Sequence, residues 1–64
     1  MRRFKVVITL SSGDVLERTT QNPHRLVSSL SKEFVPRQEY EMLQVLGLTS
    51  LVKGYIVSVK ADLL

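Results

Sequence analysis

The single histidine, His24, is the only imidazole that the chain offers for acid–base chemistry near neutral pH. The sequence has no cysteine, so a nucleophile activated by His24 would have to be a serine hydroxyl. His24 follows Pro23 at the start of an expected helix, where the positive end of the helix dipole disfavours a protonated imidazole. We therefore expect no catalytic residue and predict that the protein is not an enzyme.

Two acidic side chains, Glu39 and Glu41, stand two positions apart after Pro36. On a strand they would point to the same side, and paired carboxylates can transfer protons or bind a hard cation. An exposed segment after a proline favours a solvated pair instead. One histidine and no cysteine cannot supply a histidine- or cysteine-based metal site from one chain, so we expect no metal and no cofactor.

The start of the expected helix is the best candidate for binding a small anion. Asn22 can cap this helix, Pro23 suits its first position, and free amides at a helix N-terminus attract phosphate or carboxylate groups. His24 and Arg25 lie in the same turn. We favour plain capping, and an anionic ligand sequestered there between subunits is kept as an alternative function.

Basic residues are concentrated near the N-terminus, and the formal net charge is +3. Arg3 and Lys5 would share one face of the first strand, whereas the face of Arg18 depends on a strand register that the sequence leaves open. Sheets that bind nucleic acids add aromatic side chains that stack on bases, and only Tyr40 and Tyr55 lie outside the expected core. Nucleic-acid binding by the basic hairpin is therefore a second alternative, carried by Arg2, Arg3, Lys5 and Arg18.

The chain has 64 residues and a mass of 7.3 kDa, so we expect a single domain spanning 1–64. Apolar residues make up 44% and charged residues 23%, which is typical of folded rather than disordered proteins. Domains this small bury only roughly 60% of the surface of the unfolded chain and are often reinforced by disulfides, a metal or a second copy. Because cysteine is absent, we expect a homo-oligomer, most simply a dimer.

The N-terminal half predicts a β-hairpin followed by a helix. Apolar and polar residues alternate over 3–10, and a turn leads to a returning strand, so the hairpin spans 3–20. The helix that follows carries one apolar stripe, formed by Leu26, Val27, Leu30 and Phe34. Pro36 should end it near Glu33 or Phe34, because the residue before a proline avoids helical geometry.

Residues 37–47 fit two structures. A preceding proline and a final Gly47 suit a helix with a glycine cap, whereas Met42–Leu46 is apolar on both sides like a central strand, which we favour. A short strand at Ser50–Val52, a clear strand at Tyr55–Ala61 and a tail at Asp62–Leu64 complete the chain. The predicted fold class is α+β, with one antiparallel sheet (β-β-α-β-β-β) and a single helix on one face; the alternative is β-β-α-α-β.

The stretch Met42–Val59, MLQVLGLTSLVKGYIVSV, is similar to the C-terminal half of many small phage and mobile-element proteins. In those proteins an apolar strand reaches a glycine turn, and a short strand leads to a lysine and a closing Ile-Val-x-Val strand. The hairpin with Ser12-Gly13-Asp14 resembles theirs too. The resemblance covers the larger part of the chain and implies a compact accessory protein of bacterial or phage origin, without assigning functional residues.

The leading hypothesis is a non-enzymatic accessory protein of the phage or mobile-element type. It would act as a homo-oligomeric protein-interaction module that binds or inhibits a host or defence protein. No apolar run is long enough to cross a bilayer or to form a signal peptide, so we expect no membrane partner and a cytoplasmic location, in the host if phage-encoded. Unpaired sheet edges attract a second copy, and the candidate contact positions are apolar: Val7, Leu51, Ile56, Leu63 and Leu64.

Overall fold

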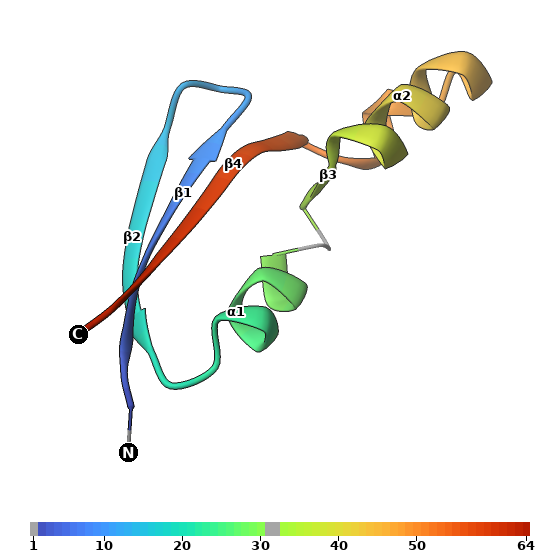
Figure 1. Cartoon of the computed structure of the whole chain (residues 1–64). Helices are drawn as coiled ribbons and strands as arrows, with labels where there is room; N and C mark the ends of the chain where they lie inside the picture. The colour runs from blue at the N-terminus through green and yellow to red at the C-terminus, as the bar shows by residue number, and fades with distance from the viewer. Residues whose placement is uncertain (1, 31–32) are drawn as a thin grey trace.

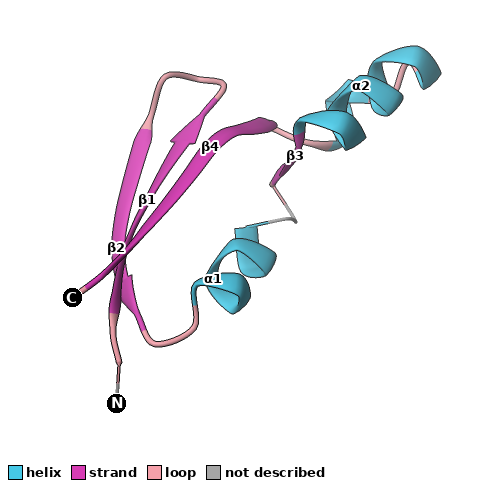
Figure 2. Ribbon diagram, in the orientation of Figure 1, coloured by secondary structure: helices cyan, strands magenta, loops and turns pink. Residues whose placement is uncertain are grey.

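A computed structural model describes residues 2–30 and 33–64, and Figures 1 and 2 show the arrangement of the helices and strands. The four strands are β1 (Phe4–Leu10), β2 (Val15–Thr20), β3 (Phe34–Pro36) and β4 (Gly54–Leu63). They form one sheet in the order β2-β1-β4-β3. β1 pairs antiparallel with β2 and with β4, whereas β3 runs parallel to β4. The predicted α+β class is confirmed, but the sheet is mixed rather than wholly antiparallel.

The β1–β2 hairpin forms as predicted, and its pairing puts alternate residues on opposite faces of the sheet. Val6 and Ile8 are completely buried, at 0% and 1% exposure, and Leu10 is buried beside them. Gly13 occupies the turn with a φ of 91°, which residues with a side chain rarely adopt. Alternation therefore predicted both the strand and its buried face correctly.

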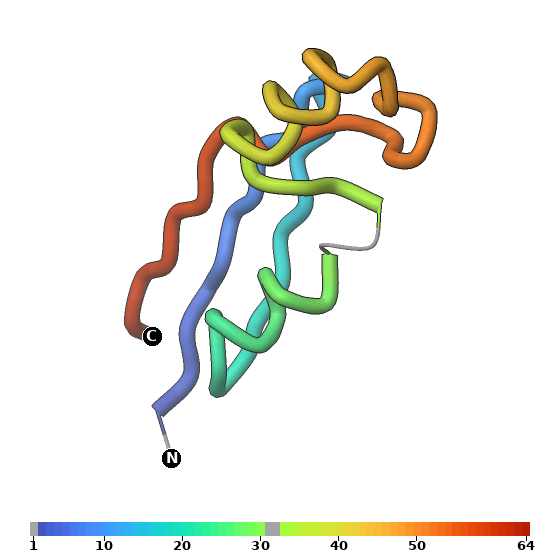
Figure 3. Tube along the Cα trace, turned by 90° about the vertical axis from the view of Figure 1, so that its right-hand side faces the viewer, coloured from blue at the N-terminus to red at the C-terminus, as the bar shows by residue number. Residues whose placement is uncertain are grey.

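Helix α1 (Pro23–Leu30) covers the same face over β1 and β2, as Figure 3 shows. The Asn22 Oδ1 accepts a hydrogen bond from the Arg25 amide at 3.0 Å, so the predicted cap is confirmed. The predicted end of this helix is wrong, because Glu33 lies in a turn and Phe34 begins β3. Ser31 and Lys32 lie outside the described residues.

Residues 37–46 form a second helix, α2 (Arg37–Leu46), so the favoured strand was wrong and the single-helix fold with it. Gly47 ends the helix with a φ of 71° and donates its amide to the Gln44 carbonyl at 3.1 Å. The Leu48 amide donates to the Leu43 carbonyl at 2.8 Å. This pair of bonds satisfies the last carbonyls of the helix in the manner of a Schellman motif.

α2 and the short 3-10 helix η1 (Thr49–Leu51) form an arm, residues 37–53, that projects beyond one end of the sheet (Figure 1). The predicted strand at Ser50–Val52 is therefore wrong. The molecule is elongated as a result, with extents of 43 × 20 × 14 Å. At the base of the arm the Tyr40 and Tyr55 rings lie with centroids 4.9 Å apart. The Lys53 amide donates to the Glu33 carbonyl at 2.8 Å, and the Lys53 Nζ lies 3.5 Å from the Glu33 Oε1.

β4 extends further than the sequence predicted, because Asp62 and Leu63 belong to the strand rather than to a tail. Its first residue, Gly54, is buried against Ser11, and a Cβ added there would collide with the Ser11 hydroxyl. That hydroxyl accepts the Tyr55 amide at 3.0 Å, while the Ser11 amide donates to the Tyr55 carbonyl at 2.9 Å. These bonds anchor the start of β4 to the end of β1.

Candidate functional site

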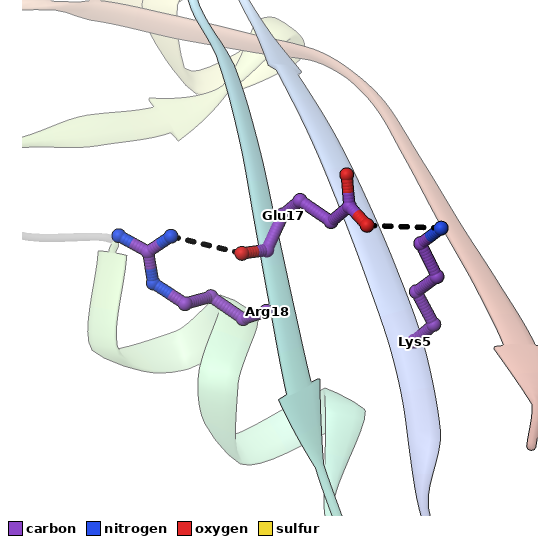
Figure 4. A network of polar contacts seen from close by, with 3 residues as sticks. All are labelled: Lys5, Glu17 and Arg18. Carbon is purple, nitrogen blue, oxygen red and sulfur yellow. Dashed lines mark hydrogen bonds and ion pairs between the residues drawn. The ribbon is translucent and has the colours of Figure 1, made fainter.

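The four basic residues of the hairpin do not form one surface. The register pairs Lys5 with Thr19 and Arg18 with Val6, so Lys5 and Arg18 lie on opposite faces of the sheet. In Figure 4 the Arg18 side chain points away from the Lys5–Glu17 pair, and its guanidinium donates to the Glu17 carbonyl at 2.9 Å. Arg2 and Arg3 are exposed at the N-terminal end of β1. The register therefore divides the charge that the nucleic-acid alternative requires.

Lys5 is engaged by acidic side chains from both neighbouring strands. Its Nζ lies 2.9 Å from the Glu17 Oε1, and Asp62 is its cross-strand partner on β4. The hydrogen bond and the charge of Glu17, with a smaller contribution from Asp62, raise the pKa of Lys5 above its ordinary value. The two tyrosines left for base stacking contact each other at the base of the arm. These contacts give the nucleic-acid hypothesis no support.

The first turn of α1 uses its own polar groups. The Arg25 amide is bound by the Asn22 side chain, the Leu26 amide donates to the Asn22 carbonyl at 3.2 Å, and Pro23 has no amide hydrogen. His24 and Arg25 are exposed there. An anion could therefore meet at most one backbone amide of this turn, that of His24, which favours plain capping.

Within residues 2–30 and 33–64 we find no pocket and no group of three or more histidine, cysteine, aspartate or glutamate side chains that could hold a metal ion. Glu39 and Glu41 lie on a helix, so they do not share a side as they would on a strand. Glu41 instead forms an ion pair with Arg37 at 3.6 Å. Among these residues no helix is long and apolar enough to span a membrane.

The five predicted contact positions fall into two groups. Leu51, Leu63 and Leu64 are strongly exposed, at 67%, 57% and 69%. Val7 is half-buried on the face away from α1, and Ile56 packs against the buried core residues. Ile56 therefore behaves as an ordinary core residue, while the three leucines are available for contact with another molecule.

Two apolar surfaces stand out on the described part of the chain. The arm surface, on α2, η1 and the two-residue link between them, consists of Met42, Val45, Leu46, Leu48 and Leu51. The edge surface, along β4 and the residue after it, consists of Val57, Val59, Ala61, Leu63 and Leu64. Sequence reasoning placed Val57 and Val59 on a regular strand without predicting their exposure. Their exposure could not be read from alternation, because it depends on where α1 lies.

The two long edges of the sheet differ in chemistry. β2 carries Glu17, Arg18 and Thr19 along its exposed edge, and charged side chains there discourage pairing with another strand. β4 also carries two charged residues, Lys60 and Asp62, but it presents three apolar side chains beside them: Val57, Val59 and Leu63, which are 55%, 44% and 57% exposed. The apolar edge of β4 is therefore the better surface for contact between proteins.

Comparison of this chain with family models, with curated proteins and with solved structures finds no match, so its own side chains and strand register carry the functional argument.

Proposed function

We propose that this protein is a non-enzymatic protein-interaction module that acts as a homo-oligomer. The observation that carries the proposal is the distribution of apolar side chains. Ten large hydrophobic residues of the described chain are 41–82% exposed, while only four hydrophobic residues there are buried. Burial of apolar surface contributes about 25 cal/mol per Å², so covering these side chains by another protein strongly favours association.

The arrangement of these side chains adds support, because nine of the ten gather on two surfaces rather than being scattered singly, and the tenth is Val15 on β2. The arm surface projects from the sheet. The edge surface runs along β4, which over most of its length pairs with a strand on only one side within residues 2–30 and 33–64. Extended apolar surfaces of this kind are typical of protein–protein contacts. That the partner is a host or defence protein, and the chain a phage-type accessory protein, stays a prediction from the sequence resemblance.

The experiment is native mass spectrometry of the untagged protein over a wide concentration range, together with light scattering after size-exclusion chromatography. We expect a species at twice the 7.3 kDa chain mass whose fraction grows with protein concentration. Circular dichroism at each concentration checks that the chain is folded throughout. A folded monomer at every concentration would contradict the homo-oligomer.

A further inference from the structure

The part of β4 beyond Ile56 offers an open edge. β3 pairs with β4 only at Gly54–Ile56, and over Val57–Leu63 the described residues place a strand, β1, on one side alone. Figure 3 shows this stretch at the outer edge of the sheet, beside β1 and to the side of α1. An edge strand with free N–H and C=O groups readily pairs with another strand.

One hydrogen bond fixes which backbone groups are free. The Leu64 amide donates to the Arg3 carbonyl at 2.9 Å, so the backbone groups of Leu64 point toward β1. In an antiparallel pair, successive residues turn these groups to alternate sides of the strand. Those of Ser58, Lys60 and Asp62 therefore also point toward β1. The groups that point toward the open edge belong to Val59, Ala61 and Leu63.

The register with β1 also assigns the side chains to faces. Val59, Ala61 and Leu63 oppose Ile8, Val6 and Phe4 respectively, on the face that α1 covers further across the sheet. Lys60 and Asp62 lie on the other face, opposite Val7 and Lys5. If a two-fold axis perpendicular to the sheet relates two copies, corresponding faces of the two sheets lie on the same side of the combined sheet. Apolar side chains would then lie beside apolar ones, and charged side chains beside charged ones.

Charge and space favour one of the four alignments centred on residues 59–62. Centred on Ala61, the pairing sets Lys60 of each copy directly opposite Asp62 of the partner subunit. Centred on Lys60 it sets two lysines opposite each other, and centred on Asp62 two aspartates, and like charges at directly opposed positions destabilise a strand pair. Centred on Val59, it would bring Leu63 of the partner subunit opposite Tyr55, where β3 already lies.

We propose that two copies of this chain pair antiparallel through β4, centred on Ala61, so that one continuous sheet runs through both. Lys60 of each copy forms an ion pair with Asp62 of the other, and the backbone groups of Val59, Ala61 and Leu63 supply the hydrogen bonds. This pairing rests on the homo-oligomer proposed above and names its contact surface. Because the two-fold axis closes the contact, the pair does not extend into a fibre.

Disulfide cross-linking tests the alignment, and the natural absence of cysteine makes each engineered thiol unambiguous. In the proposed dimer the two Ala61 Cα atoms are about 5.5 Å apart, within the range of a disulfide, so Ala61→Cys links to itself on mild oxidation. Two copies of residue 60, or of residue 62, sit diagonally at about 7–8 Å, so Lys60→Cys alone and Asp62→Cys alone link slowly. A mixture of these two variants links to each other, and intact mass identifies the mixed product.

Thr19→Cys, exposed on β2, supplies the rate of linking by random collision. The proposal requires Ala61→Cys to link at least tenfold faster than this control, and the mixed product to exceed either self-linked product. Self-linking of Lys60→Cys or Asp62→Cys at the rate of Ala61→Cys would overturn the alignment.

A dimer by native mass without linking at residue 61 would place the contact elsewhere, and the proposed homo-oligomer would stand without this edge. A monomer at every concentration would remove both. In that case Lys60 and Asp62 would serve to keep an exposed edge from pairing at all.

Discussion

The hairpin half of the molecule and the arm use similar apolar side chains to opposite effect. In the hairpin half, β1 lies between two strands and beneath α1, and its Val6 and Ile8 are 0% and 1% exposed. In the arm, Val45 is 82% exposed and Met42 60%, and none of the residues of α2 or η1 is buried. Burial in this protein therefore follows from the place of a residue in the topology and not from its type.

This difference should also divide the stability of the molecule. The central strand β1 has hydrogen-bonded neighbours on both sides, whereas the arm is held mainly at its base by the Tyr40–Tyr55 contact and the Lys53 amide. Regions with few buried contacts open locally at a lower free energy than the whole chain unfolds. The arm should therefore open without unfolding the sheet.

The largest expected effect comes from truncating one apolar side chain in each region. Ile8→Ala removes a completely buried side chain and should lower the free energy of unfolding by about 2–5 kcal/mol. Val45→Ala removes an exposed helical side chain and should change it by no more than about 0.5 kcal/mol, since alanine also favours the helix. Urea unfolding at one fixed protein concentration measures both.

Ile8→Val is the milder companion, expected to cost about 0.5–1.5 kcal/mol, in case the alanine variant does not fold. Equal losses for Ile8→Ala and Val45→Ala would mean that the arm is packed in solution, for example against another molecule. Repeating the measurement at higher concentration then separates association from intramolecular packing, because only association depends on concentration.

A second test applies the same backbone strain to both regions. Gly13 in the hairpin turn and Gly47 at the end of α2 both have positive φ, and a Cβ at either position meets no atom within 4 Å. Gly13→Ala and Gly47→Ala should each cost about 1–2 kcal/mol, from backbone conformation alone. We expect Gly13→Ala to lower the free energy of global unfolding and Gly47→Ala mainly to speed hydrogen exchange of the α2 amides.

Hydrogen exchange read by NMR distinguishes the two variants residue by residue. If Gly47→Ala lowers the protection of β1 amides as much as that of α2 amides, the arm and the sheet unfold as one unit. The contrast between the two regions would then hold for burial alone and not for stability.

The sequence predicted the hairpin half better than the arm, for a physical reason. Alternation over 3–10, the Asn22 cap and the apolar stripe of α1 are local signals, and all are confirmed except that Phe34, expected on the stripe, begins β3. Pro36 before the segment 37–47 and Gly47 at its end suit the two ends of a helix. The apolar residues of this segment lie on two sides, however, and so many apolar side chains were not expected to be exposed. A buried strand was favoured for that reason. The three-residue β3 is too short to show a period, and Pro36 fits it because an edge strand tolerates a missing amide.

The candidate surface was predictable only in part. Leu51, Leu63 and Leu64 were singled out from the sequence and are exposed, while Ile56 packs on the core. The open edge of β4 could not be predicted, because strand order decides it. The separation of Arg18 from Lys5 could not be predicted either, because it follows from the pairing of Arg18 with Val6 rather than from composition.

The smallest expected effect compares one exposed ion pair in each region. One ion pair joins β1 to β2, with the Lys5 Nζ 2.9 Å from the Glu17 Oε1. The other joins successive turns of α2, with the Arg37 Nε 3.6 Å from the Glu41 Oε1. The raised pKa of Lys5 means that the folded state holds this proton more tightly than the unfolded chain. Its contribution to stability is therefore complete below the ordinary lysine pKa of about 10.4 and is lost as the pH rises through the higher folded value.

Glu17→Gln should remove this part of the alkaline loss of stability, whereas Glu41→Gln should leave it unchanged, because Lys5 keeps its partner there. The measurement is the urea midpoint of the wild type and both variants from neutral to alkaline pH, with the Lys5 titration followed by NMR. Both variants keep every lysine and tyrosine of the wild type, so the difference between the curves isolates Lys5. Parallel curves for Glu17→Gln and wild type would show that the Lys5–Glu17 pair contributes as little to stability as the exposed pair on the arm. The hairpin half would then owe its stability to buried side chains and backbone pairing alone.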